Sequence, residues 1–209
     1  YGDRLRHILV RHEQGAIHAA QGYARSKGIP GVITVTSGPG ATNVVTGIAD
    51  AMIDSTPVVV IAGQVGTHLL GTDAFQECDV IGLTGPICKW NYQIRRPEDI
   101  AWAVARAFYI ARSGRPGPVV LDLTRDAQVG MAEYRHEECR FIRSYNPYPE
   151  VPQESIEEAA RMIDEAARPL LVFGQGITLG GAEKELASFL RKSGIPSGST
   201  LLGLSAVPT

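Results

Sequence analysis

The run Pro57-Val58-Val59-Val60-Ile61-Ala62 is apolar at every position, without the alternation of a half-exposed strand. An unbroken run of this kind, rich in β-branched residues, indicates a strand buried on both faces of its sheet. Comparable segments predict further strands at residues 7–10, 31–35, 89–94 and 118–123. Helical patterns separate them at residues 13–27, 41–53 and 97–112. This alternation predicts an α/β fold with a mainly parallel sheet.

A second unit is predicted after the periodicity disappears between residues 127 and 153, where a Pro-rich segment reads as an extended linker. Ser155 and Glu158 have the spacing of a capping box and predict a helix to about residue 167. A strand at 169–173, a helix at 181–192 and a short strand near Ile195 follow. We therefore predict a first domain over 1–128, a linker over 129–153, and the beginning of another α/β domain over 154–209.

Composition narrows the class of protein. The chain has 209 residues, a formal net charge of −2, and 44% hydrophobic residues, which predicts a globular protein without a nucleic-acid or membrane partner. Its 3 cysteines form no C-x-x-C pair and fit a reducing compartment. The histidine spacing predicts no zinc site, and no residue is predicted to bind a metal. Because the chain starts without Met and stops after an apolar run, we expect a fragment of a longer protein.

Glu13 is the first candidate for a functional residue because it stands where a predicted strand passes into a helix. One interpretation is an ordinary first-turn acid, favoured by the helix dipole. The other is a buried carboxylate, because the helix that follows is rich in glycine and alanine and allows close approach. Such a carboxylate has a raised pKa and can share a proton with a ring nitrogen.

Three further segments are candidates, and the first two of them allow two interpretations each. The Gly-rich segment at residues 36–43 is either a phosphate cradle or a tight βα turn. Residues 71–77 place an aromatic side chain and an amide in the long irregular stretch from Gly63 to Thr84, which is either a solvated loop or part of a site. The G-x-G at residues 174–176 follows a strand and is a weak dinucleotide signal.

Four motifs occur in an order that resembles one family. They are Arg11-His12-Glu13-Gln14-Gly15-Ala16, Thr36-Ser37-Gly38-Pro39-Gly40-Ala41-Thr42-Asn43, Gly63-Gln64-Val65 and Gly71-Thr72-Asp73-Ala74-Phe75-Gln76-Glu77. With them the chain resembles the catalytic subunits of acetolactate synthases, thiamine-diphosphate enzymes of branched-chain amino-acid biosynthesis. The resemblance covers essentially the whole chain. It implies most of the pyrimidine-binding domain, incomplete at its N-terminus, and the first part of a central domain associated with FAD.

The resemblance implies a transferase that condenses two 2-oxo acids, pyruvate with pyruvate or 2-oxobutyrate, with loss of CO2. Glu13 matches the glutamate that bonds N1′ of the thiamine pyrimidine. Pro39, Asn43 and Gln76 match residues around the same ring, and Phe75 matches their aromatic neighbour at the mouth of the site. Arg125 stands where the family often has a lysine. It keeps the charge with a different geometry and is a candidate for a substrate contact. The matches to FAD-contacting positions are Arg115, Gly174, Gln175, Gly176, Thr200, Leu201 and Leu202.

The resemblance also implies parts that this chain lacks. The Mg2+ and diphosphate ligands belong to a further domain, and the active site lies between two subunits. It therefore implies a homodimer or homotetramer, a small regulatory subunit in some members, and an inactive isolated fragment. The expected location is the cytoplasm in bacteria and a plastid or mitochondrion in eukaryotes. Two alternatives stay open, a sister enzyme of the pyruvate oxidase or decarboxylase type, and a non-catalytic binding protein that reuses the fold.

Overall fold

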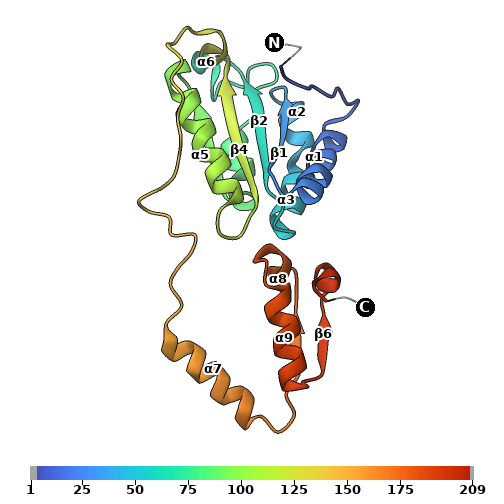
Figure 1. The fold of residues 1–209 in the computed structure, drawn as a ribbon. Helices are drawn as coiled ribbons and strands as arrows, with labels where there is room; N and C mark the ends of the chain where they lie inside the picture. Colours follow the sequence, from blue (N-terminus) through green and yellow to red (C-terminus); the bar gives the residue numbers. More distant parts are fainter. Residues whose placement is uncertain (1–3, 208–209) are drawn as a thin grey trace. The chain divides into compact units, whose positions relative to one another are not determined.

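The computed structural model describes residues 4–207, and the chain divides into two compact units, Tyr1–Pro149 and Glu150–Thr209 (Figure 1). The division lies inside the linker predicted over residues 129–153, whose limits stay a prediction. Among the described residues, no helix is long and apolar enough to cross a bilayer.

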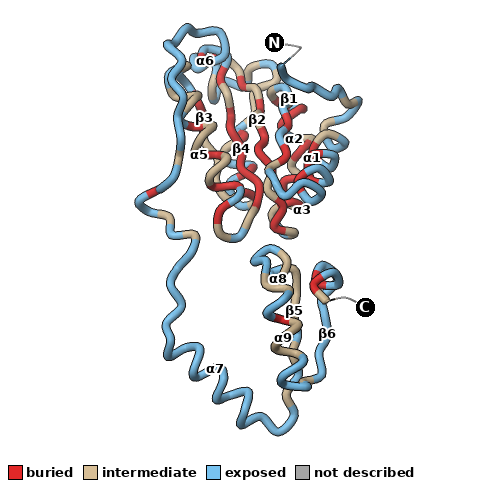
Figure 2. The backbone as a smooth tube through the Cα atoms, in the orientation of Figure 1, coloured by how far each residue is buried: buried red, intermediate tan, exposed pale blue. Residues whose placement is uncertain are grey.

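The first unit is built on a parallel sheet of four strands in the order β1-β2-β4-β3, which confirms the predicted fold class. The two central strands have the longest apolar runs, and their valines are almost completely buried (Figure 2). Val60, for example, lies opposite Ile33 on one side and Val120 on the other. The strands are β1 Gly31–Val35, β2 Val58–Gln64, β3 Trp90–Ile94 and β4 Pro118–Thr124.

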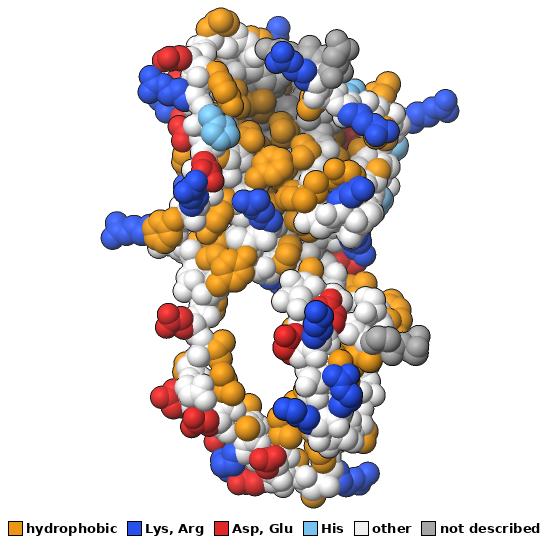
Figure 3. Space-filling model, in the orientation of Figure 1, with side chains coloured by type: hydrophobic (Ala, Val, Ile, Leu, Met, Phe, Trp, Pro, Cys, Tyr) orange, Lys and Arg blue, Asp and Glu red, His pale blue; other side chains and the backbone are white. Residues whose placement is uncertain are grey.

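Helices cover both faces of this sheet. On one face α1 and α3 enclose a core that includes Ile17, Ile48 and Val60. On the other, α5 packs on β3 and β4 around Leu121. Towards β1 this second face is more open, and Val32 is 48% exposed; Figure 3 shows hydrophobic side chains gathered on the near face of this unit. The helices are α1 Glu13–Lys27, α2 Pro39–Asn43, α3 Val45–Ile53, α4 Val80–Thr84, α5 Ile100–Arg112 and α6 Arg125–Val129.

The α1 helix begins and ends where the sequence predicts. Gly28 has a left-handed backbone with φ 69°, and its N–H donates to the carbonyl of Ala24 at 2.9 Å. This is the usual glycine stop of a helix, because a residue without Cβ takes positive φ without strain.

A close contact between α1 and α3 gives a prediction about stability. A Cβ on Gly47 would lie 2.2 Å from Cγ2 of Ile17, a fully buried side chain. Gly47→Ala is therefore expected to destabilise the protein by about 1–3 kcal/mol through overpacking. The matched control is Gly22→Ala on the exposed side of α1, where a Cβ meets nothing within 4 Å. Thermal unfolding should show the control slightly more stable than the wild type, and an equal gain at Gly47 would contradict the close packing.

The strand predicted at residues 7–10 is wrong. This segment has no regular secondary structure and joins no ladder in the described part of the chain, and Ile8 and Leu9 are 71% and 87% exposed. An apolar run becomes a strand only where another strand lies beside it to take up its backbone hydrogen bonds. The sequence carries the apolar run but does not say what lies next to it.

Two predicted elements have different limits in the structure. The helix expected over 41–53 begins at Pro39 and divides at Val44 into α2 and α3, because the Val44 N–H bonds to the close carbonyls of Ala41 and Thr42. The irregular stretch expected over 63–84 is shorter. It starts after Gln64, contains a 3-10 turn at Thr67–Leu69, and ends in α4. The predicted helix at 97–112 likewise opens with a 3-10 turn, Pro97–Asp99, before α5.

Part of the predicted linker is fixed to the first unit. Ile142 is 5% exposed and forms an isolated bridge with Tyr145. The Tyr145 hydroxyl donates to the Ser113 carbonyl at 3.0 Å and accepts from Lys89 Nζ at 3.1 Å. These contacts hold the segment against the C-terminal end of α5.

The second unit contains a two-stranded parallel sheet, with β5 pairing with β6. The predicted capping box is wrong, because α7 already begins at Gln153 after Pro152 and Ser155 lies inside its first turn. The short strand lies a little beyond the predicted position, and α8 was not predicted. The elements are α7 Gln153–Glu165, β5 Leu171–Phe173, α8 Gly176–Leu179, α9 Glu183–Ser193, β6 Ser197–Ser199 and a 3-10 helix at Leu201–Ala206.

Candidate active site

The candidate residues of the first unit gather at the carboxyl edge of its sheet. The segments that follow β1, β2 and β4 all leave from this edge. The helix α1 leads into β1 through a short turn and spans 15 residues, about 22 Å, so its first residue returns to the same edge (Figure 1). In parallel α/β sheets, this edge is where ligands bind.

A hydrogen bond joins two of the predicted site residues. Asn43, the last residue of α2, donates from Nδ2 to Oε2 of Glu13 at 3.0 Å. Glu13 is the first residue of α1, which is capped by the His12 ring, whose Nδ1 accepts from the N–H of Gln14 at 3.1 Å. The cap and the amide together fix where the carboxylate lies.

The ionisation of Glu13 differs from the buried-carboxylate interpretation. Its side chain is only half-buried. A backbone N–H at the start of α1 and the Asn43 amide both donate to the carboxylate, and they hold the pKa of Glu13 below its ordinary value. The expected raised pKa is therefore wrong for this chain, because hydrogen bonds to the charged form outweigh the desolvation. Glu13 is presented as an anion that accepts hydrogen bonds.

The loop after β2 brings Gln76 to the turn after β1. A Cβ on Gly38 would lie 2.8 Å from both the Cα and the carbonyl oxygen of Gln76, so only glycine allows the two backbones to come this close. Gln76 itself has φ 58° and Asp73 has φ 56°, which are unusual for residues with a side chain. Phe75, beside Gln76, is 87% exposed. Two contacts, Glu13 with Asn43 and Gly38 with Gln76, thus bring three segments to this edge of the sheet, and Pro39 follows Gly38 in one of them.

The Gly-rich segment after β1 has the contacts of a tight βα turn. The N–H of Gly40 donates to the Ser37 carbonyl at 3.3 Å, and that of Thr42 to the Gly38 carbonyl at 3.0 Å. The helix that it opens, α2, has only 5 residues. Because these amides are already used within the segment, the structure favours the turn over the phosphate cradle.

The two candidate arginines lie at opposite edges of the sheet. Arg115 is in the connection from α5 to β4, at the opposite edge of the sheet. Its Nε donates to Ser55 Oγ at 2.8 Å and its Nη2 to the Ile53 carbonyl at 2.9 Å, so it covers the C-terminal end of α3. Arg125 is exposed and opens α6 at the carboxyl edge, where its N–H donates to the Val65 carbonyl at 3.3 Å.

The candidates of the second unit come together at the ends of its two strands. Thr200 donates its N–H to the Phe173 carbonyl at 2.9 Å, and a Cβ on Gly174 would lie 3.0 Å from Thr200 Oγ1. Gln175 and Gly176 open α8. Leu201 and Leu202 begin the last 3-10 helix, with 82% and 37% of their surfaces exposed.

Sequence reasoning missed a buried polar group in the sheet of the first unit. Asp122 is fully buried in β4, and its Oδ2 accepts from Gln93 Nε2 at 2.7 Å and Gln64 Nε2 at 3.3 Å. Burial raises the pKa of Asp122, although both glutamine amides act against it. The signal was present in the sequence as a single acid within the apolar run of residues 118–123.

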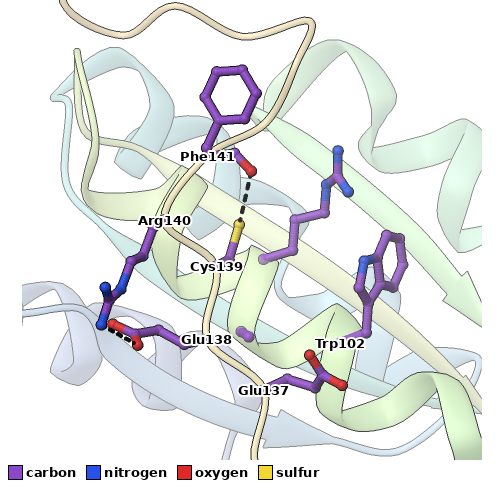
Figure 4. Close-up of a pocket in the computed structure, with 8 residues that line it drawn as sticks. Trp102, Glu137, Glu138, Cys139, Arg140 and Phe141 are labelled. Carbon is purple, nitrogen blue, oxygen red and sulfur yellow. Dashed lines mark hydrogen bonds and ion pairs between the residues drawn. The ribbon is translucent and has the colours of Figure 1, made fainter.

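Two hollows on the surface of the first unit contain none of the predicted thiamine residues. The smaller, of about 150 Å³, lies between α5 and residues 137–141 (Figure 4). Its wall includes Trp102 with the Arg106 guanidinium 5.0 Å from the ring centroid. The larger, of about 540 Å³, is lined by parts of α5, α6 and residues 130–137. Cys139 and Glu137 line the smaller hollow, but neither hollow contains a residue that the resemblance places around thiamine, so the carboxyl edge of the sheet is the better candidate.

Comparison with known proteins gives matches at both ends of the chain. The model described as thiamine pyrophosphate enzyme, N-terminal TPP binding domain matches residues 1–83, and the corresponding central-domain model matches residues 156–209. The chain is 47% identical to the acetolactate synthase large subunit of Corynebacterium glutamicum over 205 residues, which are 98% of this chain and 33% of that protein. For the large subunit of Lactococcus lactis the identity is 46% over 204 residues, 98% of this chain and 36% of that protein. The chain spans about a third of the length of the curated relatives that it matches.

Proposed function

Because this chain belongs to the thiamine pyrophosphate enzymes, we propose that it is the pyrimidine-binding part and the beginning of the central domain of an acetolactate synthase large subunit. The observation that carries the proposal is the contact of Asn43 with the ionised Glu13, beside the close approach of Gly38 to Gln76. These four positions come from three separate segments and meet at one edge of the sheet.

The residues present fit the pyrimidine of thiamine diphosphate. When bound, the cofactor supplies a thiazolium carbon that takes up a 2-oxo acid and accepts the electrons released with CO2. Glu13 would hold a proton at the pyrimidine N1′, because an ionised carboxylate stabilises a protonated ring nitrogen. Asn43 would keep that carboxylate in place, and Pro39 and Gln76 would border the ring. Phe75 and Arg125 are proposed to face substrate.

A binding site for FAD is proposed on different grounds. The contact of Gly174 with Thr200 puts two of the candidate segments at the same end of the second unit's sheet. Arg115 offers a positive charge on the first unit, although its guanidinium is already bound to the end of α3. No residue of this chain is proposed as a Mg2+ ligand. A homodimer or homotetramer and a small regulatory subunit are further proposals, and the name "large subunit" of the relatives supports the latter.

The test is an assay of the full-length protein with pyruvate, thiamine diphosphate, Mg2+ and FAD. Acetolactate is the expected product, and added 2-oxobutyrate should give the mixed condensation product. Acetyl phosphate or a free aldehyde in place of acetolactate would identify a sister enzyme instead. Binding of thiamine diphosphate with no turnover of any 2-oxo acid would favour a non-catalytic binding protein.

A further inference from the structure

The loop that carries Gln76 is tied at both of its ends by side chains. Near its start, the N–H of Thr67 donates to Oδ2 of Asp126 at 2.5 Å. Near its end, the carbonyl of Cys78 accepts from Nε2 of Gln64 at 2.7 Å. The loop therefore closes on Gln64, the last residue of β2.

The Gln64 amide joins the two ends of the loop. Its Oε1 accepts from the N–H of Val65, the first loop residue, at 2.9 Å, while its Nε2 reaches Cys78. The side chain is only 4% exposed, so water does not compete for these bonds. Cys78 is two residues from Gln76, and a shift of its carbonyl would move the backbone that contacts Gly38.

Asp122 fixes the direction of that amide. Its Oδ2 accepts the second hydrogen of Gln64 Nε2 at 3.3 Å. A reversed amide would place the Gln64 oxygen against two acceptors, the Cys78 carbonyl and the Asp122 carboxyl. Within residues 4–207 the other oxygen of Asp122, Oδ1, is buried and has no hydrogen-bond partner. Burying an unpaired oxygen costs free energy, so a buried carboxyl at this position needs an explanation.

We propose that Asp122 is a positioning residue, which acts through Gln64 to hold the loop of residues 65–78 and so keeps Gln76 against Gly38. The inference rests on the proposed function only in treating Gln76 as a contact of the pyrimidine. The hydrogen-bonded chain from Asp122 through Gln64 to Cys78 is a property of the fold alone.

The test compares two glutamines that donate to the same oxygen of Asp122. Only Gln64 also reaches the loop, whereas Gln93 is on β3. In the full-length protein without cofactor, Gln64→Ala should raise amide hydrogen–deuterium exchange over residues 66–79 roughly tenfold, because a buried pair of hydrogen bonds is lost. Gln93→Ala should leave exchange in this loop unchanged. Equal exchange in the two variants, whether raised or not, would overturn the proposal.

A double-mutant cycle tests whether Asp122 acts through Gln64. Asp122→Ala should raise loop exchange as Gln64→Ala does, and the double variant should exchange no faster than Gln64→Ala alone. Asp122→Asn keeps an acceptor for Gln64 and should restore the wild-type loop. If Asp122→Ala does not fold, Asp122→Ser takes its place. A merely structural role of Asp122 would be shown by additive increases in loop exchange in the double variant. It would also be shown by loop exchange in Asp122→Asn as fast as in Asp122→Ala.

Cofactor saturation separates this inference from the proposed function. Gln64→Ala should raise the half-saturating concentration of thiamine diphosphate by roughly tenfold and leave the rate at saturation close to that of the wild type, because the loop is displaced rather than lost. A change in the saturated rate alone would contradict the positioning role. If the wild-type protein binds no thiamine diphosphate, the proposed function fails, while the exchange measurements still decide whether Asp122 holds the loop through Gln64.

Discussion

Glu13→Gln is expected to slow hydrogen–deuterium exchange at C2 of bound thiamine diphosphate by about 100-fold or more in the full-length protein. The amide has nearly the same size as the carboxylate and can still meet Asn43, so the fold should survive. It carries no negative charge, however, and cannot stabilise a protonated N1′. A backbone N–H and the Asn43 amide lower the pKa of Glu13, so they favour its charged form in the folded chain.

The control for this experiment is a second glutamate in the first turn of a helix. Glu154 occupies that position in α7 and is exposed. If Glu13 were an ordinary first-turn acid, both substitutions would have the same small effect on stability and none on C2 exchange. In Glu154→Gln, C2 of bound thiamine diphosphate is expected to exchange at the wild-type rate. An unchanged C2 exchange rate in Glu13→Gln would show that Glu13 does not act at N1′ of the pyrimidine.

Gly38→Ala is expected to raise the half-saturating concentration of thiamine diphosphate tenfold or more in the full-length protein. Two effects combine. The residue has φ 57° and ψ −111°, a conformation that only glycine adopts without strain, at roughly 1–3 kcal/mol for other residues. In addition, the new Cβ would lie 2.8 Å from backbone atoms of Gln76, which cannot turn aside as a side chain can. The loop must therefore move away from the turn.

Gly71→Ala separates the backbone strain of alanine at positive φ from the displacement of the loop by a new Cβ. Gly71 lies in the same loop with φ 72°, but a Cβ there meets nothing within 4 Å. Alanine at this position should lower stability by about 1–2 kcal/mol and leave cofactor saturation close to that of the wild type. If Gly38→Ala and Gly71→Ala gave the same half-saturating concentration, the close approach of Gly38 to Gln76 would have no role in binding.

The site could be predicted in part. Its residues were named from their resemblance to a family, because four short motifs in a fixed order are far more specific than any one of them. Spacing alone left Glu13 between two interpretations, and the one with a buried carboxylate carries a raised pKa, which is the wrong direction for this chain. The pKa of Glu13 is lowered first by a backbone N–H at the start of α1 and then by the amide of Asn43, which is 30 positions away and reaches the carboxylate only in the folded chain. The Asp122 carboxyl was missed because its partners are on two other strands.

Local sequence patterns were enough to predict two kinds of element. These are helices with their own end signals and strands that are buried on both faces. The sequence by itself defined α1 from its first residue to its glycine stop, and the central strands from runs such as Val58 to Ala62. Tertiary structure decided the rest. It left Ile8 and Leu9 outside the sheet, brought Gln76 against Gly38, and set Gln64 between Asp122 and the loop. These outcomes depend on which segments become neighbours in space, and hydrogen bonds and close contacts between distant residues have no periodicity along the chain.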